Sequence, residues 1–315
     1  MFGVSGSSGL IYTWVNEGFA SAGGLITANE PFIALYGYNS GRQLFLNGTL
    51  VGTNGSTAKN FTADNHKLGI EFNGGSGFNS PFDGNIAEVI IYNVAPAAID
   101  RSRVESYLAL KYGLTLPSNY ILSDNSTTVW TTGGGYDNDI AGIGIDNGSG
   151  LSQLASRSVN PDSIVTITGT VASMVSGEFL LWGNDDGATT FAGIGTVSGV
   201  ATANSRLGRI WKAAETGDVG SVTVGFDSAS LQTGETYCLL VDNDGNFTNG
   251  GTTQVACTVA NSLVTFSHDF ATGTAPFFIL GTVTVVPTAP GGVDSNLQLW
   301  LKADAGIAVA DGVAI

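Results

Sequence analysis

Charged residues, cysteines, histidines and long hydrophobic runs are all scarce in this sequence. Only 12% of the 315 residues are charged, and 26 acidic against 11 basic residues give a formal net charge of −15. An acidic balance of this size argues against nucleic acid or an anionic membrane surface as a partner. The longest apolar run, residues 277–286, contains Gly281 and Thr282 and is shorter than the ~20 residues needed to cross a bilayer. We therefore expect no membrane insertion.

The chain has only two histidines and two cysteines, so few residues could bind a transition metal or act as a nucleophile or base. His66 and His268 stand in turn-like polar contexts and are more typical of solvated loop residues than of catalytic bases. Cys238 and Cys257 lack the close paired spacing of a zinc site. Because apolar segments surround both cysteines, a disulfide between neighbouring strands and a pair of reduced thiols fit the sequence equally well. No G-x-x-x-x-G-K-[ST] loop is present, so nucleotide binding has no support.

Glycine, by contrast, is abundant. The chain has 45 glycines, is rich in Asn, Thr and Ser, and is 43% hydrophobic. This composition is typical of short strands joined by tight turns, and it is unlike that of a disordered acidic chain. The length predicts two domains with room for a sizeable core. We therefore predict an all-β protein.

The first 80 residues read as strands and turns. The best hairpin is R-Q-L-F-L-N-G-T-L-V-G, residues 42–52. Its two apolar arms meet at Asn47-Gly48, the pair that best tolerates the positive φ angles of a type I′ turn. Residues 31–38 and 67–72 are predicted strands on composition and alternation.

Residues 81–113 contain the clearest local signals. The run Ile86–Tyr92 is dense in β-branched and aromatic residues, which predicts a strand with at least one buried face. Pro96 suits the first position of a helix, and apolar residues at helical spacing follow it. Gly113 supplies a left-handed stop. We predict a helix at about 96–112 that closes the first domain across one end of a sheet.

This region resembles a known superfamily. The segments L-F-L-N-G-T-L-V-G and F-D-G-N-I-A-E-V-I-I-Y-N resemble the second half of a laminin-G-like domain of the concanavalin A-like lectin and glucanase superfamily, over residues 1–116. The continuation R-V-E-S-Y-L-A-L-K-Y-G-L-T-L resembles the form in large Bacteroidetes surface proteins, where a second β domain follows. The resemblance implies a partial jelly-roll β-sandwich, secretion, and adhesion or binding, often to glycans. It carries over no ligand residues.

Residues 117–283 are predicted to form a second β-sandwich, because short strands recur there between Gly and Asp turns. The predicted strands are 127–131, 140–145, 164–168, 178–182, 209–213, 221–226, 237–242, 255–259, 263–266 and 277–280. Segments such as F-L-L-W-G-N-D-D-G and Y-C-L-L-V-D-N-D-G resemble the companion domain of those surface proteins.

The last 32 residues divide into a linker and a segment that resembles the start of another module. Residues 284–293 are a Pro/Gly linker. Residues 294–315 open with N-L-Q-L-W-L-K-A-D-A-G, which resembles the first strand of a further laminin-G-like module. The simplest interpretation is a piece of a repeat array. A sharper hypothesis is that Asn296–Ala303 folds back and supplies an edge strand to the first domain.

Catalysis is not expected. Retaining glycoside hydrolysis needs two carboxyl groups about 5 Å apart, which on a strand means acids at alternate positions. The strand around Glu88 has one acid with apolar neighbours, and Glu71 and Glu178 are isolated. We interpret Glu88 as a structural carboxylate that bonds to neighbouring backbone.

Calcium is the cofactor that the turns favour, since hard oxygens cluster beside glycine. The acidic candidates are Asp137, Asp139, Asp185, Asp186, Asp242 and Asp244. The last two are the best placed by type, although no turn continues into a full EF-hand pattern. The alternative is that Asp, Asn and Gly are there simply as turn formers.

Glycan binding would use exposed aromatic rings beside polar turns. Phe78 and Tyr136 are the best candidates, because each follows a glycine-rich loop. We predict a non-catalytic module of a secreted or cell-surface adhesin, bound to a polysaccharide or surface glycoconjugate and to neighbouring modules of its parent chain. Residues 1–6 have no basic region followed by an apolar core, so no signal peptide is read from the chain. A structural spacer is the alternative function, and a glucanase-type hydrolase comes third.

Overall fold

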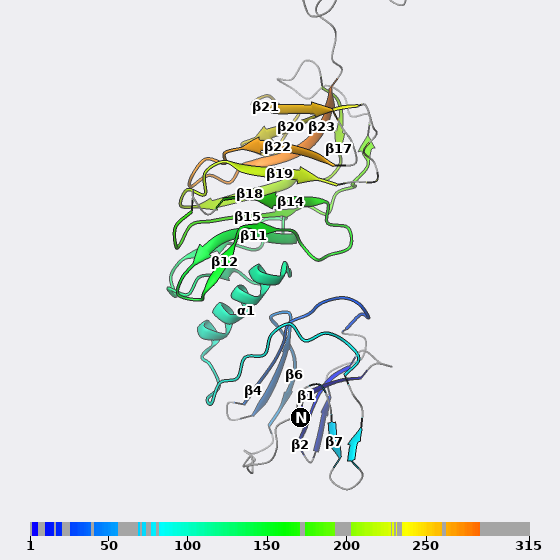
Figure 1. Cartoon of the computed structure of the whole chain (residues 1–315), viewed down its shortest axis with the longest axis vertical. Helices are drawn as coiled ribbons and strands as arrows, with labels where there is room; N and C mark the ends of the chain where they lie inside the picture. Colours follow the sequence, from blue (N-terminus) through cyan, green and yellow to red (C-terminus); the bar gives the residue numbers. More distant parts are fainter. Residues whose placement is uncertain are drawn as a thin grey trace, which may run out of the picture.

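The protein consists of two β units with a helix between them (Figure 1). The computed structural model describes residues 2–5, 10–15, 17–20, 26–38, 41–55, 69, 71–73, 77–79, 82–170, 174–192, 203–227, 229, 231, 235–259 and 263–283. The predicted linker 284–293 and the predicted strand of a further module in 294–315 lie outside these residues. Within them strands dominate, so the all-β prediction is confirmed. No helix among them is long and apolar enough to cross a membrane.

The first unit is built from short antiparallel sheets. Its strands are β1 (Phe2–Ser5), β2 (Leu10–Val15) and β3 (Glu17–Ala20) in one sheet, β4 (Ala34–Tyr38), β5 (Arg42–Leu46) and β6 (Thr49–Asn54) in a second, and β7 (Glu71–Asn73) with β8 (Gly77–Asn79) in a third. The predicted hairpin is confirmed: β5 and β6 pair across Asn47 and Gly48, whose φ angles of 45° and 79° are both positive. Such angles match the Asn-Gly preference of a type I′ turn.

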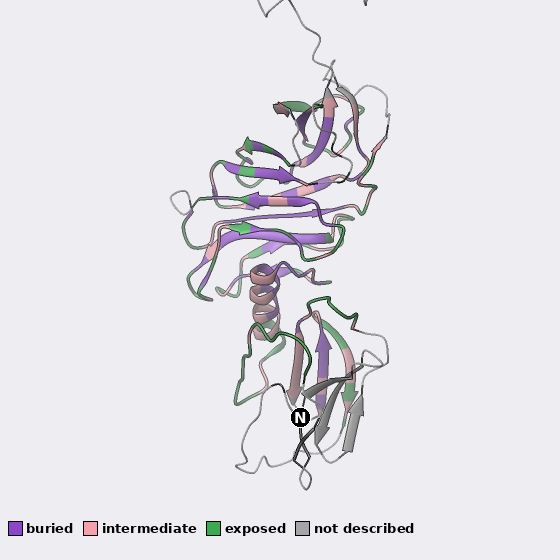
Figure 2. Cartoon of the chain, turned by 45° about the vertical axis from the view of Figure 1, so that its right-hand side comes forward, coloured by how far each residue is buried: buried purple, intermediate pink, exposed green. Residues whose placement is uncertain are grey.

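Residues 82–97 correct the sequence prediction. The expected strand over Ile86–Tyr92 is wrong: this segment is outside every strand and helix of the structure. It is green along much of its length in Figure 2, because its apolar side chains are exposed. Ile91 is 87% exposed and Val94 is 69% exposed. Composition favours a strand here, but no described strand pairs with this segment through a hydrogen-bond ladder.

Helix α1 (Ala98–Tyr112) agrees with the prediction of a helix at 96–112. It ends at Gly113, whose φ of 67° is left-handed and suits a residue without Cβ. The sequence assigns this helix to the first unit, but its buried residues Ala109 and Leu110 pack in one apolar cluster with Phe179 of the second unit. Gly142 permits this close approach, since an added Cβ would lie 3.0 Å from Leu110.

The second unit is a sandwich of two antiparallel sheets. The nine-stranded sheet has the order β12-β11-β15-β18-β23-β17-β16, with β20 pairing β21 and β23, and the four-stranded sheet has the order β13-β14-β19-β22. The strands of the larger sheet are β11 (Asn138–Asp146), β12 (Leu151–Gln153), β15 (Phe179–Asn184), β16 (Phe191–Ala192), β17 (Ala203–Leu207), β18 (Trp211–Thr216), β20 (Thr236–Asp242), β21 (Thr253–Val259) and β23 (Phe277–Val283). Those of the smaller sheet are β13 (Ala155–Ser156), β14 (Val165–Thr168), β19 (Val222–Phe226) and β22 (Val264–His268), and β9 (Tyr120–Ile121) pairs with β10 (Thr128–Trp130) separately. Every strand predicted here from the sequence is present.

The core explains why β15 reads F-L-L-W without polar alternation. Leu180 and Trp182 belong to the cluster between the two sheets. Phe179 and Leu181, on the opposite face, belong to the cluster beneath α1. Both faces of this central strand are therefore buried, which favours a continuous apolar run. Across the sandwich, Trp211 of the larger sheet meets a phenylalanine of β19 edge-on, with ring centroids 5.5 Å apart.

The pairing of β20 with β21 decides between a disulfide and two reduced thiols. Cys238 is disulfide-bonded in the structure, and Cys257 stands opposite it in the strand register. Because these are the only cysteines of the chain, the bond closes the hairpin between them. Of the two alternatives left open by the sequence, the structure has the disulfide.

Candidate functional site: the junction cleft

The two aromatic residues predicted to bind glycan have different outcomes. The backbone of Phe78 lies in β8, but its side chain is outside the described part of the chain. Tyr136 is half-buried and packs on Phe277, with ring centroids 4.9 Å apart and planes inclined by 56°. Burial, together with the negative charge of Asp185, raises the pKa of its hydroxyl. Tyr136 therefore packs on Phe277, and its role in glycan binding stays a prediction.

The predicted calcium ligands Asp137 and Asp185 are held by donors of the protein itself. The carboxylate of Asp137 accepts hydrogen bonds from the indole N–H of Trp130 at 3.0 Å and from the backbone N–H of Gly133 at 2.7 Å. One oxygen of Asp185 accepts from the backbone N–H groups of Gly187 and Ile210. The bond from Gly187 to Asp185 is the Asx-turn contact expected of a turn-forming carboxylate, and the other three bonds tie these carboxylates to neighbouring segments.

Asp139, at the start of β11, and Asp186, in the connection after β15, meet at the guanidinium of Arg209. Asp139 is 5% exposed and accepts from Arg209 Nη1 at 3.1 Å. It also accepts from the side-chain amides of Asn160 and Asn184, at 2.7 and 2.8 Å. Arg209 Nη2 lies 3.4 Å from Asp186. A buried arginine therefore supplies the positive charge that a cation would otherwise bring to these two carboxylates.

The turn favoured most by the sequence, Asp242–Asp244, is also closed internally. Asp242 is buried, and it accepts from the backbone N–H groups of residues 244 and 245 and from the hydroxyl of Thr252 at 2.8 Å. Asp244 is exposed and accepts from Asn246 and Asn249. Hydrogen-bond donation from Asn249 lowers the pKa of the Asp244 carboxyl. Calcium at this turn stays a prediction.

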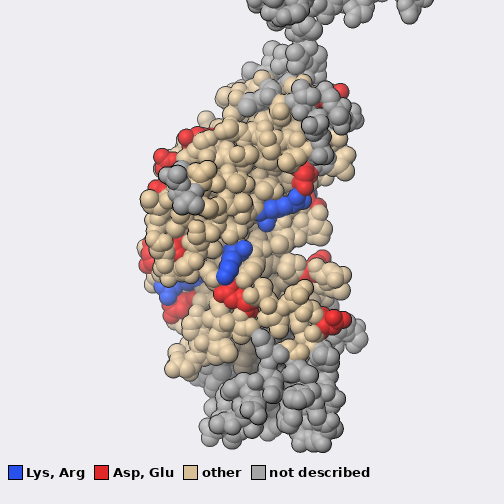
Figure 3. Space-filling view, viewed as in Figure 1, with Lys and Arg blue, Asp and Glu red and all other residues tan. Residues whose placement is uncertain are grey.

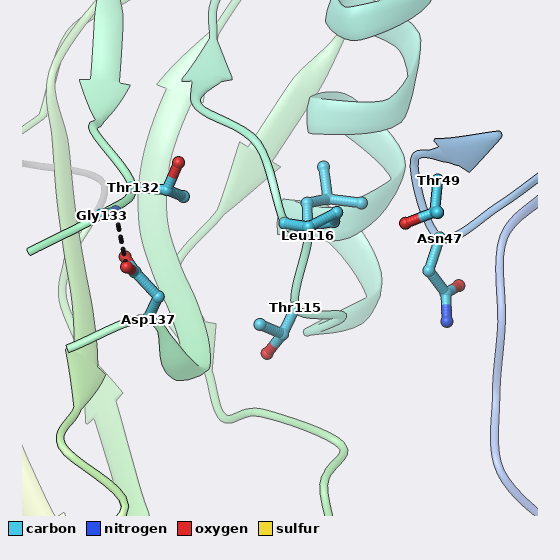
Figure 4. Close-up of a pocket in the computed structure, with 8 residues that line it drawn as sticks. Asn47, Thr49, Thr115, Leu116, Thr132, Gly133 and Asp137 are labelled. Carbon is cyan, nitrogen blue, oxygen red and sulfur yellow. Dashed lines mark hydrogen bonds between the residues drawn. The ribbon is translucent and has the colours of Figure 1, made fainter. Parts of the chain in front are cut away.

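A cleft of about 520 Å³ lies where the two units meet. Asn47 and Thr49 come from the β5–β6 hairpin of the first unit, whereas Thr115, Thr132 and Asp137 come from the second (Figure 4). A smaller cavity of about 140 Å³ continues the same junction and shares Asn47 and Thr115. In the space-filling view the molecule is hollowed between the units, and charged side chains are scattered over a largely uncharged face (Figure 3).

Hydrogen bonds fix the polar groups of this cleft before any ligand arrives. The side-chain oxygen of Asn47 accepts from the N–H of Ile33 at 2.7 Å, which leaves its amide nitrogen to donate. The hydroxyl of Thr115 accepts a hydrogen bond from the N–H of Ile140 at 3.0 Å, so its own proton points away from that N–H and can be donated to another group. Thr132 bonds to Asn119. Oriented donors and acceptors on a rigid lining suit a polar, uncharged ligand.

Helix α1 holds the two sides of the cleft together. Glu88 of the first unit accepts hydrogen bonds from Lys111 Nζ at 2.8 Å and from the hydroxyl of Tyr112 at 3.0 Å. Its bond from Lys111 is the main reason why the pKa of the Glu88 carboxyl is lowered. The guanidinium of Arg101 stacks 4.0 Å from the ring centroid of Phe45 in the hairpin. Glu88 is thus a structural carboxylate, bonded to helix side chains and not to backbone as first interpreted.

The cleft could not be identified from the sequence. Asn47 was recognisable as a turn residue, but Thr115 and Thr132 carry no motif. They meet the hairpin only because α1 and residues 114–117 bring the second unit against its tip. An added Cβ at Gly48 would lie 3.5 Å from Leu116, which shows how closely the turn approaches that segment.

These features define a two-sheet β-sandwich with an outer helix, joined to a smaller β unit across a polar cleft. The family described as "Domain of unknown function (DUF8202)" matches residues 100–274, more than half of the chain, and the chain belongs to that family. The match begins in α1 and covers most of the sandwich, in agreement with the packing of the helix on the second unit. Comparisons with curated proteins and with solved structures found no match.

Proposed function

We propose that the protein is a non-catalytic binding module of a secreted or cell-surface adhesin and that the junction cleft holds a carbohydrate-type ligand. The observation that carries this proposal is the lining of the cleft, to which three threonines and Asn47 contribute from both units. Sugar hydroxyls both donate and accept hydrogen bonds, and these side chains do the same.

Support for a non-catalytic role comes from the acids of the cleft. Asp137 is the one acidic residue on the described lining of the larger cavity, and both of its oxygens already accept hydrogen bonds. Hydrolysis of a glycosidic bond commonly uses a pair of carboxyl groups on either side of the bond. The described lining of the larger cavity supplies only one of them, and the next acid of the junction, Glu30, lines the smaller cavity.

The test is a glycan-array screen followed by titration of a hit against two cleft variants. Thr49→Val and Thr132→Val each remove a hydroxyl with little change of shape, and Thr53→Val on the same strand as Thr49 is the matched control. Each lost hydrogen bond costs about 0.5–1.5 kcal/mol, so the double variant should bind about tenfold more weakly. Equal affinity of the double variant and the control would place binding elsewhere. Silence of the array would contradict the carbohydrate proposal.

A second candidate function is that of a structural spacer, favoured by the contacts of α1 with both units. Glu88 and Arg101 each link the helix region to the first unit, and a fixed angle between units is what a spacer needs. Small-angle X-ray scattering of the wild type and of Glu88→Ala tests this function. A spacer requires one defined shape for the wild type and a broader distribution for the variant, and identical broad profiles would contradict it.

A further inference from the structure

Three carboxylates meet at one end of the sandwich, away from the turns that the sequence favours. Glu215 lies near the end of β18, Asp218 follows in the connection to β19, and Asp269 comes directly after β22. One carboxylate oxygen from each lies within 4.8 Å of those of the other two. The strand register explains the meeting, because Val222 at the start of β19 pairs with His268 at the end of β22.

Glu215 is the unusual member of this triad. Glu215 is 5% exposed, and one of its carboxylate oxygens accepts a hydrogen bond from the backbone N–H of Val219 at 2.9 Å. The other oxygen, Oε2, is buried and has no hydrogen-bond partner among the described residues. A buried, unpaired carboxylate oxygen is costly and calls for a partner.

The described residues around Glu215 add negative charge, and none of them forms an ion pair with it. Burial raises the pKa of its carboxyl to about 7, and the charges of Asp218, Asp269 and Glu178 act in the same direction. At neutral pH and above, the triad therefore concentrates like charges that repel one another.

We propose that Glu215, Asp218 and Asp269 form a calcium-binding site. Calcium binds oxygen ligands at 2.3–2.6 Å, so two ligand oxygens on opposite sides of the ion lie up to about 5 Å apart, a limit that the triad satisfies. Asp218 and Asp269 are exposed, so water has access to complete the coordination shell. A magnesium ion would demand a tighter octahedral arrangement than these three side chains readily supply.

The position of the site suggests what the ion would do. Glu215 belongs to the nine-stranded sheet, whereas Asp269 follows a strand of the four-stranded sheet. Calcium would therefore tie the two sheets together at one end of the sandwich. This stabilising role is separate from the junction cleft and does not depend on glycan binding.

The experiment is calorimetric titration of chelator-stripped protein with calcium at about pH 8, with thermal melts in parallel. The wild type should bind one ion, and at ~100 times Kd its melting temperature should rise by about 5 °C or more. Asp218→Asn and Asp269→Asn change exposed side chains, should fold, and should each weaken calcium binding at least about tenfold. Asp244→Asn, in the turn favoured by the sequence, is the matched control and should bind like the wild type.

Two results would overturn the proposal. One is a wild type with neither binding heat nor a thermal shift at millimolar calcium. The other is loss of binding in Asp244→Asn while Asp218→Asn and Asp269→Asn retain it. Glu215→Gln distinguishes a triad that binds calcium from one in which Glu215 is simply protonated. If Glu215 is only protonated, Glu215→Gln should have a higher melting temperature than the wild type in chelator, and calcium should change the melting temperature of neither protein. The site that we propose requires that Glu215→Gln abolish the calcium-induced shift.

Discussion

Removal of Arg209 tests whether the acidic turns of the sandwich are built around an internal cation. Arg209→Met keeps much of the side-chain volume but leaves Asp139 buried, at 5% exposure, without its charged partner. Breaking a buried pair from one side costs about 3–5 kcal/mol. The exposed partners contribute less, because Asp162 and Asp186 have side chains 55% and 69% exposed and surface pairs are worth about 0–1 kcal/mol.

The assay is urea unfolding of the wild type, Arg209→Met, Asp162→Ala and the double variant Asp139→Asn/Arg209→Met. We expect a loss of about 3–5 kcal/mol for Arg209→Met and under about 1 kcal/mol for Asp162→Ala. The double variant should recover part of the loss, because it no longer buries an unpaired charge. If Arg209→Met costs no more than Asp162→Ala, the reasoning is refuted and the two turns must be stabilised in another way.

Three further predictions concern the junction, the disulfide and the end of the chain. The lowered pKa of Glu88 means that its pairing with Lys111 stabilises the fold fully above the unfolded-state pKa and is lost as pH falls through the folded-state value. Unfolding measured from about pH 7 to about pH 3 should therefore show a steeper loss for the wild type than for Glu88→Gln; parallel curves would contradict the pairing. Reduction of the Cys238–Cys257 bond should lower the unfolding free energy by about 3 kcal/mol for a loop of this length, whereas free thiols titrated in the unreduced protein would refute the bond. Deletion of residues 294–315 should lower the melting temperature of the first unit if its Asn-Leu-Gln-Leu-Trp segment pairs with the exposed run, and an unchanged calorimetric profile would dismiss that pairing.

Local patterns were sufficient for most elements. The helix could be placed because Pro96 and Gly113 mark its two ends, and the β5–β6 hairpin because Asn47 and Gly48 are both needed with positive φ. Strands of the sandwich were predictable because their apolar runs lie between Gly and Asp turns. Each of these signals involves residues close together in the chain, so no knowledge of tertiary contacts was required.

The exposed run at Ile86–Tyr92 marks where local reasoning fails. Its composition favours a strand, yet a strand exists only where a neighbour completes the hydrogen-bond ladder, and no described strand does so. The six acidic turn residues show a second limit of local reasoning. Their composition suits calcium, which stays a prediction, but it does not reveal that Arg209, from a distant segment, bonds to the carboxylates of Asp139 and Asp186.

The sequence by itself determined an all-β chain, the positions of many strands of the second unit, and one helix with both of its ends. Only the tertiary structure decided that the helix packs on the sandwich, that Asn47 and Thr115 share a cleft, and that Glu215 meets Asp218 and Asp269. The physical reason is the distance along the chain over which each kind of interaction acts. Propensity and turn chemistry act over a few residues, whereas a cleft or a cation site is made by the strand register and the packing of segments far apart in the chain.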